Sequence, residues 1–106
     1  MKRIVPRDAA EQDIDQAADY YTDEAGEDIA HGFVEAVREV YRAISTHPGA
    51  GSPRYAALLG VEGLRNRKLS RFPYLVFYVE RETHIDVWRI LHAQRDIPAT
   101  LAETEN

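Results

Sequence analysis

Apolar residues recur at helical spacing in the first half of the chain and gather into short runs in the second half. From Ile14 to Ala25 an apolar residue returns every three or four positions, which marks one face of a helix. Residues 29–44 repeat this spacing with a broader apolar stripe, as expected of a helix that packs on a sheet. Gly26 and Pro48 favour the ends of the two helices. The pattern therefore predicts an antiparallel pair of helices.

Two shorter features precede the first helix. Lys2–Val5 is a candidate strand, and Pro6 is expected to end it. Asp8 and Glu11 have the spacing of a capping box, so we expect the Asp8 side chain to cap the helix that follows. The chain is thus expected to pass directly from a strand into its first helix.

The second half of the chain predicts three strands, at residues 64–71, 75–81 and 85–91. The last two are rich in β-branched and aromatic residues, which strands favour. Residues 80–84 are polar and form the turn of a hairpin. This turn has no Gly, Asn or Asp at its centre, so a tight two-residue turn is not indicated.

The strand at 85–91 is expected to lie at the centre of the sheet. Along it, Ile85, Val87 and Leu91 alternate with Trp88 and Ile90. Both faces are therefore apolar, and both should be covered by other parts of the chain.

The remaining segments complete the expected fold. Residues 50–63 contain glycine and small residues, which predicts a loop with one helical turn at Tyr55–Leu59. Residues 101–106, beyond Pro98, are expected to be a fraying tail. The predicted order is β-α-α-β-β-β in a single domain over residues 1–106. This is an α+β fold, with a helical hairpin packed on a small, mainly antiparallel sheet.

Composition narrows the class of protein. The 106 residues include no cysteine, which excludes disulfides and thiolate metal ligands. The net charge of −5 argues against a general nucleic-acid coat protein, and we expect no sequence-specific DNA binding by this chain alone. No apolar run approaches the roughly 18–20 residues of a membrane span, and the start lacks the apolar core of a signal peptide. We therefore expect a cytoplasmic protein without a membrane partner.

The charges are unevenly distributed along the chain. Residues 8–53 carry a net charge of −9, whereas residues 54–95 carry +4. One interpretation is that the later cations balance the acidic helices. The other is that they form a surface for an anionic partner. For this second interpretation the candidate binding residues are Arg65, Arg67, Arg71, Trp88, Arg89, His92 and Arg95.

Few side chains have the arrangement of a catalytic site. Metal-free cleavage of RNA needs a general base, a general acid and cations on the phosphate, and His92, Arg89 and Arg65 are the candidates for these roles. His92 is alternatively a structural residue held by hydrogen bonds at a strand end. No set of histidines has metal-ligand spacing, so we expect no metal and no cofactor.

Several short motifs occur together in a fixed order over nearly the whole chain. They are Ala10-x-x-Asp13-Ile14 and Ala30-x-x-Phe33 in the helices, then Phe72-Pro73-Tyr74-Leu75-Val76-Phe77-Tyr78, then Ile85-x-Val87-x-Arg89-Ile90-Leu91-His92-x-x-Arg95-Asp96. With these motifs the chain resembles the ParE branch of the RelE/ParE superfamily of bacterial toxins. Such toxins come from type II toxin–antitoxin modules of the plasmid-stabilisation type.

The resemblance implies a RelE/ParE-like fold and a toxin that a cognate ParD-like antitoxin neutralises. ParE-like members are generally described as inhibitors of DNA gyrase, which implies no catalytic residues and no enzymatic activity. RelE-like members instead cut mRNA on the ribosome, and a third interpretation is a non-toxic domain that only binds the antitoxin. The sequence has no Tyr after Tyr78 and no aromatic residue after His92, which departs from the RelE pattern.

Overall fold

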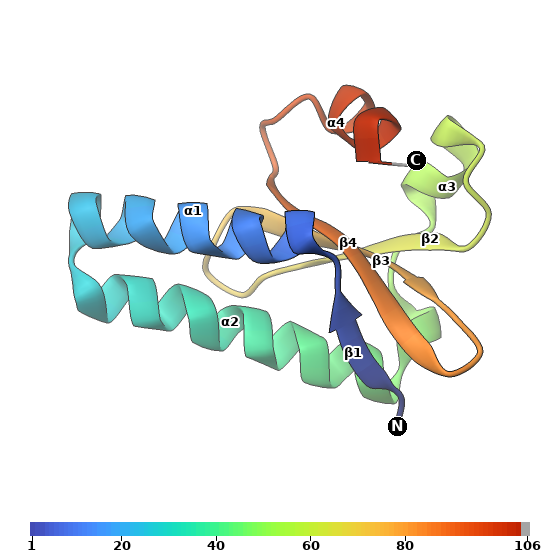
Figure 1. Cartoon of the computed structure of the whole chain (residues 1–106), viewed down its shortest axis with the longest axis horizontal. Helices are drawn as coiled ribbons and strands as arrows, with labels where there is room; N and C mark the ends of the chain where they lie inside the picture. The colour runs from blue at the N-terminus through green and yellow to red at the C-terminus, as the bar shows by residue number, and fades with distance from the viewer. Residues whose placement is uncertain (105–106) are drawn as a thin grey trace.

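The chain folds into a four-stranded sheet with helices on both of its faces (Figure 1). The computed structural model describes residues 1–104. None of the helices within these residues has the length and apolar character needed to cross a membrane. The elements, in chain order, are β1 (Arg3–Pro6), α1 (Asp8–Ala25), α2 (Glu27–Thr46), the 3₁₀ turn η1 (Pro48–Ala50), α3 (Arg54–Leu59), β2 (Leu64–Lys68), β3 (Tyr74–Glu80), β4 (His84–His92) and α4 (Ile97–Thr104).

The order of strands in the sheet is β1-β4-β3-β2. β1 runs parallel to β4, whereas β3 pairs antiparallel with both β4 and β2. The predicted α+β fold with a mainly antiparallel sheet is therefore confirmed. So is the predicted helical hairpin, because α1 and α2 lie side by side and are joined through Gly26 (Figure 1).

The sheet separates two apolar cores. One core lies under α1 and α2 and includes Phe33, Val76 and Val87. The other lies on the opposite face, where α3 and α4 cover residues such as Leu64 and Phe77. β4 lies between β1 and β3 and contributes to both cores, so the prediction of a central strand covered on both faces is confirmed.

A β-bulge in β4 changes the expected alternation. Tyr78 pairs with Val87 and Phe77 pairs with Arg89, which leaves Trp88 as an extra residue in β4. Beyond Val87 the side chains therefore change face, and Ile90 joins the core under the helical hairpin while Leu91 joins the other core. The predicted placement of Leu91 on the same face as Val87 was wrong.

Two expectations about element ends were also wrong. Arg7, and not Asp8, is the residue that precedes the first turn of α1, and no side chain caps the helix there. The acidic side chains of Asp8 and Glu11 still lie in the first turn, where the helix dipole favours negative charge. β2 ends at Lys68, three residues before the predicted end, and Arg71 adopts a positive φ of 68° in the following turn.

The C-terminal segment is a helix and not the expected fraying tail. Ile97 and Leu101 are 2% and 1% exposed, and their spacing of four places both on the face of α4 that packs against the sheet. The Asp96 side chain accepts a hydrogen bond from the Ala99 N–H, and Pro98 lies in the first turn, where its missing N–H costs nothing. Glu105 and Asn106, the end of the predicted tail, lie outside the described residues.

Candidate functional site

The Arg65 side chain is hydrogen-bonded to a backbone carbonyl within the fold. Its Nη1 donates a hydrogen bond to the Gly51 carbonyl oxygen at 2.8 Å, and the neighbouring Tyr78 hydroxyl donates to the Pro48 carbonyl oxygen at 2.6 Å. Ser52 and Asn66 add two backbone hydrogen bonds between the same two segments. These contacts attach the segment after α2 to the edge of β2, so Arg65 has a structural role.

Arg89 is paired with an acid from the first helix. Its Nε and Nη2 atoms each lie 2.8 Å from a carboxylate oxygen of Asp13, and Asp13 also accepts a hydrogen bond from the Ile90 N–H at 2.9 Å. The two side chains are only 15% and 6% exposed. The hydrogen bonds with Asp13 raise the pKa of the Arg89 guanidinium further above its ordinary value, against the effect of burial. For Arg89, the interpretation that cations balance the acidic helices is confirmed.

Asp13 is a site residue that the sequence analysis named only as part of a helix motif and not among the candidate site residues. The signal that could have found it is its spacing, because Asp13 lies three residues after Ala10 and four before Ala17, and all three are buried. A carboxylate on the buried face of a helix requires a partner in the core. Arg89, on the central strand, is that partner.

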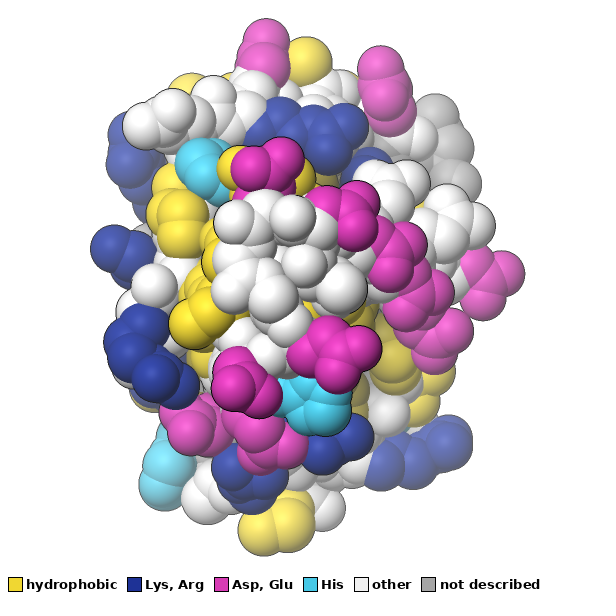
Figure 2. Space-filling model, turned by 90° about the vertical axis from the view of Figure 1, so that its left-hand side faces the viewer, with side chains coloured by type: hydrophobic (Ala, Val, Ile, Leu, Met, Phe, Trp, Pro, Cys, Tyr) yellow, Lys and Arg dark blue, Asp and Glu magenta, His cyan; other side chains and the backbone are white. Residues whose placement is uncertain are grey.

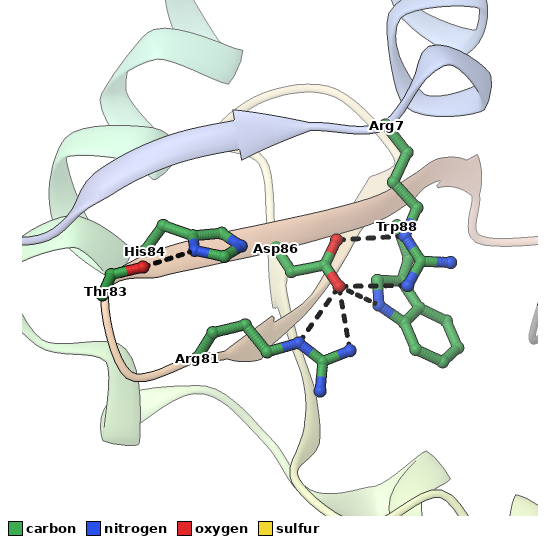
Figure 3. Close-up of polar contacts among 6 residues, drawn as sticks. All are labelled: Arg7, Arg81, Thr83, His84, Asp86 and Trp88. Atoms are coloured by element: carbon green, nitrogen blue, oxygen red, sulfur yellow. Dashed lines mark hydrogen bonds and ion pairs between the residues drawn. The ribbon is translucent and has the colours of Figure 1, made fainter.

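On the other face of the sheet, the carboxylate of a second acid, Asp86, accepts hydrogen bonds from three residues (Figure 3). Arg7 and Arg81 donate from their guanidinium groups over 3.0–3.2 Å, and the Trp88 indole N–H donates at 3.1 Å. The Arg7 guanidinium also lies over the Trp88 ring, 4.4 Å from its centroid. Trp88 is 4% exposed, so its indole lies within the protein and not on the surface.

The Asp86 cluster, formed by Arg7, Arg81, Asp86 and Trp88, predicts a loss of stability in acid. Burial raises the pKa of Asp86, but the hydrogen bonds from Arg7, Arg81 and Trp88 outweigh it and hold the pKa below its ordinary 3.8. A depressed pKa contributes stability above the unfolded-state value, and this stability is lost as the pH falls through the lower, folded-state value.

We therefore expect Asp86→Asn to lower the free energy of unfolding by about 1–3 kcal/mol at neutral pH. The deficit should shrink as the pH falls below the ordinary pKa of 3.8 and the wild-type carboxylate becomes protonated. Urea unfolding at several pH values measures this. Glu82→Gln, in the exposed turn of the same hairpin, is the matched control. A deficit that stays constant over this pH range would contradict the assignment.

Three cations without such partners lie at one end of the sheet. The side chains of Lys68, Arg71 and Arg95 are exposed, and within residues 1–104 no hydrogen bond or ion pair holds them. The segments that carry them are neighbours, because the Ala93 N–H donates to the Pro73 carbonyl oxygen at 2.8 Å. We call Lys68, Arg71 and Arg95 the sheet-end patch. Arg67 lies nearby on β2, opposite Val76, and is half-buried.

Two shallow hollows adjoin the sheet-end patch. One of about 280 Å³ is lined by Lys68, Arg71, Phe72 and Pro73. The other, of about 220 Å³, lies between α1 and the end of β4 and includes Tyr20, Tyr74, His92 and Arg95 in its wall. Figure 2 shows the side of the molecule that lies at the left of Figure 1, with basic side chains along its left margin and a row of acidic side chains down its right half. The surface thus combines cations, aromatic rings and recesses.

The His92 ring is held by a backbone hydrogen bond and by a contact with an aromatic ring. Its Nδ1 accepts a hydrogen bond from the Gln94 N–H at 3.1 Å, and its ring lies edge-on to Tyr74 with the centroids 5.2 Å apart. The candidate nuclease residues are not brought together. His92 and Arg65 lie on β4 and β2 with β3 between them, and their Cα atoms are separated by roughly 15 Å, as follows from the strand spacing. Within residues 1–104, no cluster of three or more His, Cys, Asp or Glu has the arrangement of a metal site.

Comparisons with known proteins agree with this fold. A sequence model of the ParE toxin of type II toxin–antitoxin systems, parDE, matches residues 4–97. No curated protein sequence matches the chain. Among solved structures, a chain from a chromosomal ParDE toxin–antitoxin system from P. aeruginosa is similar in fold, with a TM-score of 0.73 and 24% identity over 89% of this chain and 98% of that one. Because the matched region covers the helical hairpin, β2, β3, β4 and β1 from Ile4 onward, the chain belongs to the family of ParE toxins of type II toxin–antitoxin systems.

Proposed function

We propose that this chain is a toxin that inhibits DNA gyrase and that a cognate ParD-like antitoxin neutralises it. The observation that carries the proposal is the match to the ParE toxin family over residues 4–97. The solved structure of similar fold is described as part of a ParDE system, which supports a protein antitoxin as the partner. The toxin then acts as a bacterial protein in the cytoplasm, where gyrase works.

The geometry supports inhibition by binding over catalysis. A gyrase inhibitor needs a rigid, complementary surface and no set of reacting groups. Arg65 and Arg89 already donate to partners within the fold, so neither offers a whole guanidinium to a phosphate. His92 is well separated from Arg65 on the sheet. These placements favour the gyrase proposal over RNA cleavage on the ribosome.

Expression in bacterial cells that lack the antitoxin tests the proposal against its two alternatives. We expect the DNA-damage response to rise while protein synthesis continues at first. The variant His92→Ala should remain toxic, because removal of a proton donor does not matter to an inhibitor that works by binding. Soluble, folded protein for both forms is the necessary control, measured by circular dichroism.

Other outcomes would overturn the proposal. Early arrest of translation, with toxicity lost in folded His92→Ala, would indicate a ribosome-dependent ribonuclease. Unchanged growth with soluble wild-type protein would indicate a domain that keeps the fold but is not toxic. Each result differs from the expected one in a directly measurable quantity: DNA damage, translation rate or growth.

A further inference from the structure

Arg71 has a backbone conformation that its side chain disfavours. Its φ of 68° lies in the left-handed region, where the Cβ atom of most residues is crowded. The other positive φ angles within residues 1–104 belong to glycines, namely Gly26, Gly60 and Gly63. At Arg71 the chain therefore carries a large side chain where glycine would be less strained.

The fold imposes this conformation and gains no hydrogen bond or ion pair from the side chain in return. The Leu69 N–H donates to the Tyr74 carbonyl oxygen at 2.9 Å, which closes the turn around Arg71. Phe72 is buried, with its ring 5.2 Å from Tyr21 and 5.5 Å from Phe33, and this anchors the turn to the helical hairpin. The Arg71 side chain itself is exposed and has no hydrogen bond or ion pair within residues 1–104. Backbone strain that is not offset by a hydrogen bond or ion pair of the same side chain is typical of a functional position.

The surroundings of Arg71 indicate what it contacts. Lys68 shares the adjacent hollow with it, and Arg95 lies on the segment that is hydrogen-bonded to Pro73 at the same end of the sheet. Three exposed positive charges thus lie at the same end of the sheet, two of them beside Phe72 and Pro73. We propose that the sheet-end patch is a docking site for a short acidic segment of a protein partner, with Arg71 as the residue that binds a carboxylate. This inference rests on the proposed function only in supposing that the toxin has protein partners.

Charge favours a protein segment over a nucleic acid. The chain has a net charge of −5, and a row of acidic side chains runs down the margin opposite the basic one in Figure 2. A nucleic-acid strand carries a phosphate at every step and would extend from the patch onto those acids. A short peptide with a few carboxylates and apolar side chains fits three cations and the adjoining hollows.

An NMR titration of the ¹⁵N-labelled full chain tests the proposal. The probe is an acetylated ten-residue peptide of alternating Glu and Ala. We expect amide shifts at residues 67–73 and 92–96 that weaken as salt is added. Arg71→Gly should bind about ten-fold more weakly, since one charge-assisted pair is lost. The same substitution should raise the melting temperature by about 2–5 °C, because glycine relieves the strain.

Two further variants complete the test. Arg71→Lys keeps both the charge and the strain, so its affinity should stay within about three-fold of wild type and its melting temperature should not rise. Arg42→Gln removes an exposed arginine near the C-terminal end of α2, outside the sheet-end patch, and should leave binding unchanged. Equal binding by Arg71→Gly, a lowered melting temperature, or shifts outside the patch would overturn the proposal. So would tighter binding of a single-stranded DNA 12-mer. The titration involves no gyrase, so its failure is distinct from failure of the proposed function.

Discussion

Asp13→Asn is expected to lower the free energy of unfolding by about 3–5 kcal/mol. The substitution keeps the size of the side chain and removes its charge. The Arg89 guanidinium, only 15% exposed, then stays in the protein without a counter-ion, and water cannot fully solvate it. Because small domains have total stabilities of about 5–15 kcal/mol, a large drop in the urea midpoint should be measurable.

Asp15→Asn is the matched control for this prediction. Asp15 lies on the exposed face of the same helix, so its substitution should change the free energy of unfolding by less than about 0.5 kcal/mol. Adding Arg89→Gln to Asp13→Asn should restore part of the loss, since no unpaired charge is then buried. A cost below about 1 kcal/mol for Asp13→Asn would contradict the view that this pair holds α1 against β4.

Gly51→Ala is the second substitution with a large expected effect. A Cβ atom at this position would lie 3.0 Å from Cζ of Tyr78 and 3.1 Å from the Asn66 carbonyl oxygen. Tyr78 is fully buried and its hydroxyl is held by the Pro48 carbonyl oxygen, so the ring cannot move aside without breaking other contacts. We expect a loss of about 2–4 kcal/mol, as for overpacking in a core, together with a lower melting temperature.

The nearby Gly49 supplies the control for Gly51. A Cβ atom at Gly49 would meet nothing within 4 Å, and the residue is exposed. Gly49→Ala should therefore change the free energy of unfolding by less than about 0.5 kcal/mol in the same thermal and urea measurements. Equal effects of the two substitutions would mean that the space around Tyr78 does not limit residue 51.

The parts of the fold that depend on local pattern could be predicted from the sequence. The spacing of apolar residues over 14–25 and 29–44 predicted α1 and α2, and the runs rich in β-branched residues predicted β3 and β4. α4 was missed because its apolar face consists of only two anchoring residues, Ile97 and Leu101. Two positions are too few for a periodic signal.

The contacts of the site depend on pairs that are far apart in the chain. Arg89 and Asp13 are separated by 76 residues, and Arg7 and Asp86 by 79. Charge counts suggested that cations and acids balance, but no local rule identifies which acid meets which arginine. The bulge at Trp88 and the positive φ of Arg71 were also unpredicted, because neither residue type is characteristic of these conformations. The exposed Lys68, Arg71 and Arg95 could be told apart from the paired Arg65 and Arg89 only once the contacts of the fold were known.

Gyrase supercoiling in vitro tests the central claim most directly. Purified, folded protein is titrated against gyrase and relaxed plasmid, with an equal amount of heat-unfolded protein as the control. We predict a dose-dependent loss of supercoiling that saturates as the toxin fills its sites on gyrase, as expected of an inhibitor that acts by binding. Full supercoiling at a large excess of folded protein would contradict the account. The ribosome would then be the target to test, with His92→Ala as the first variant.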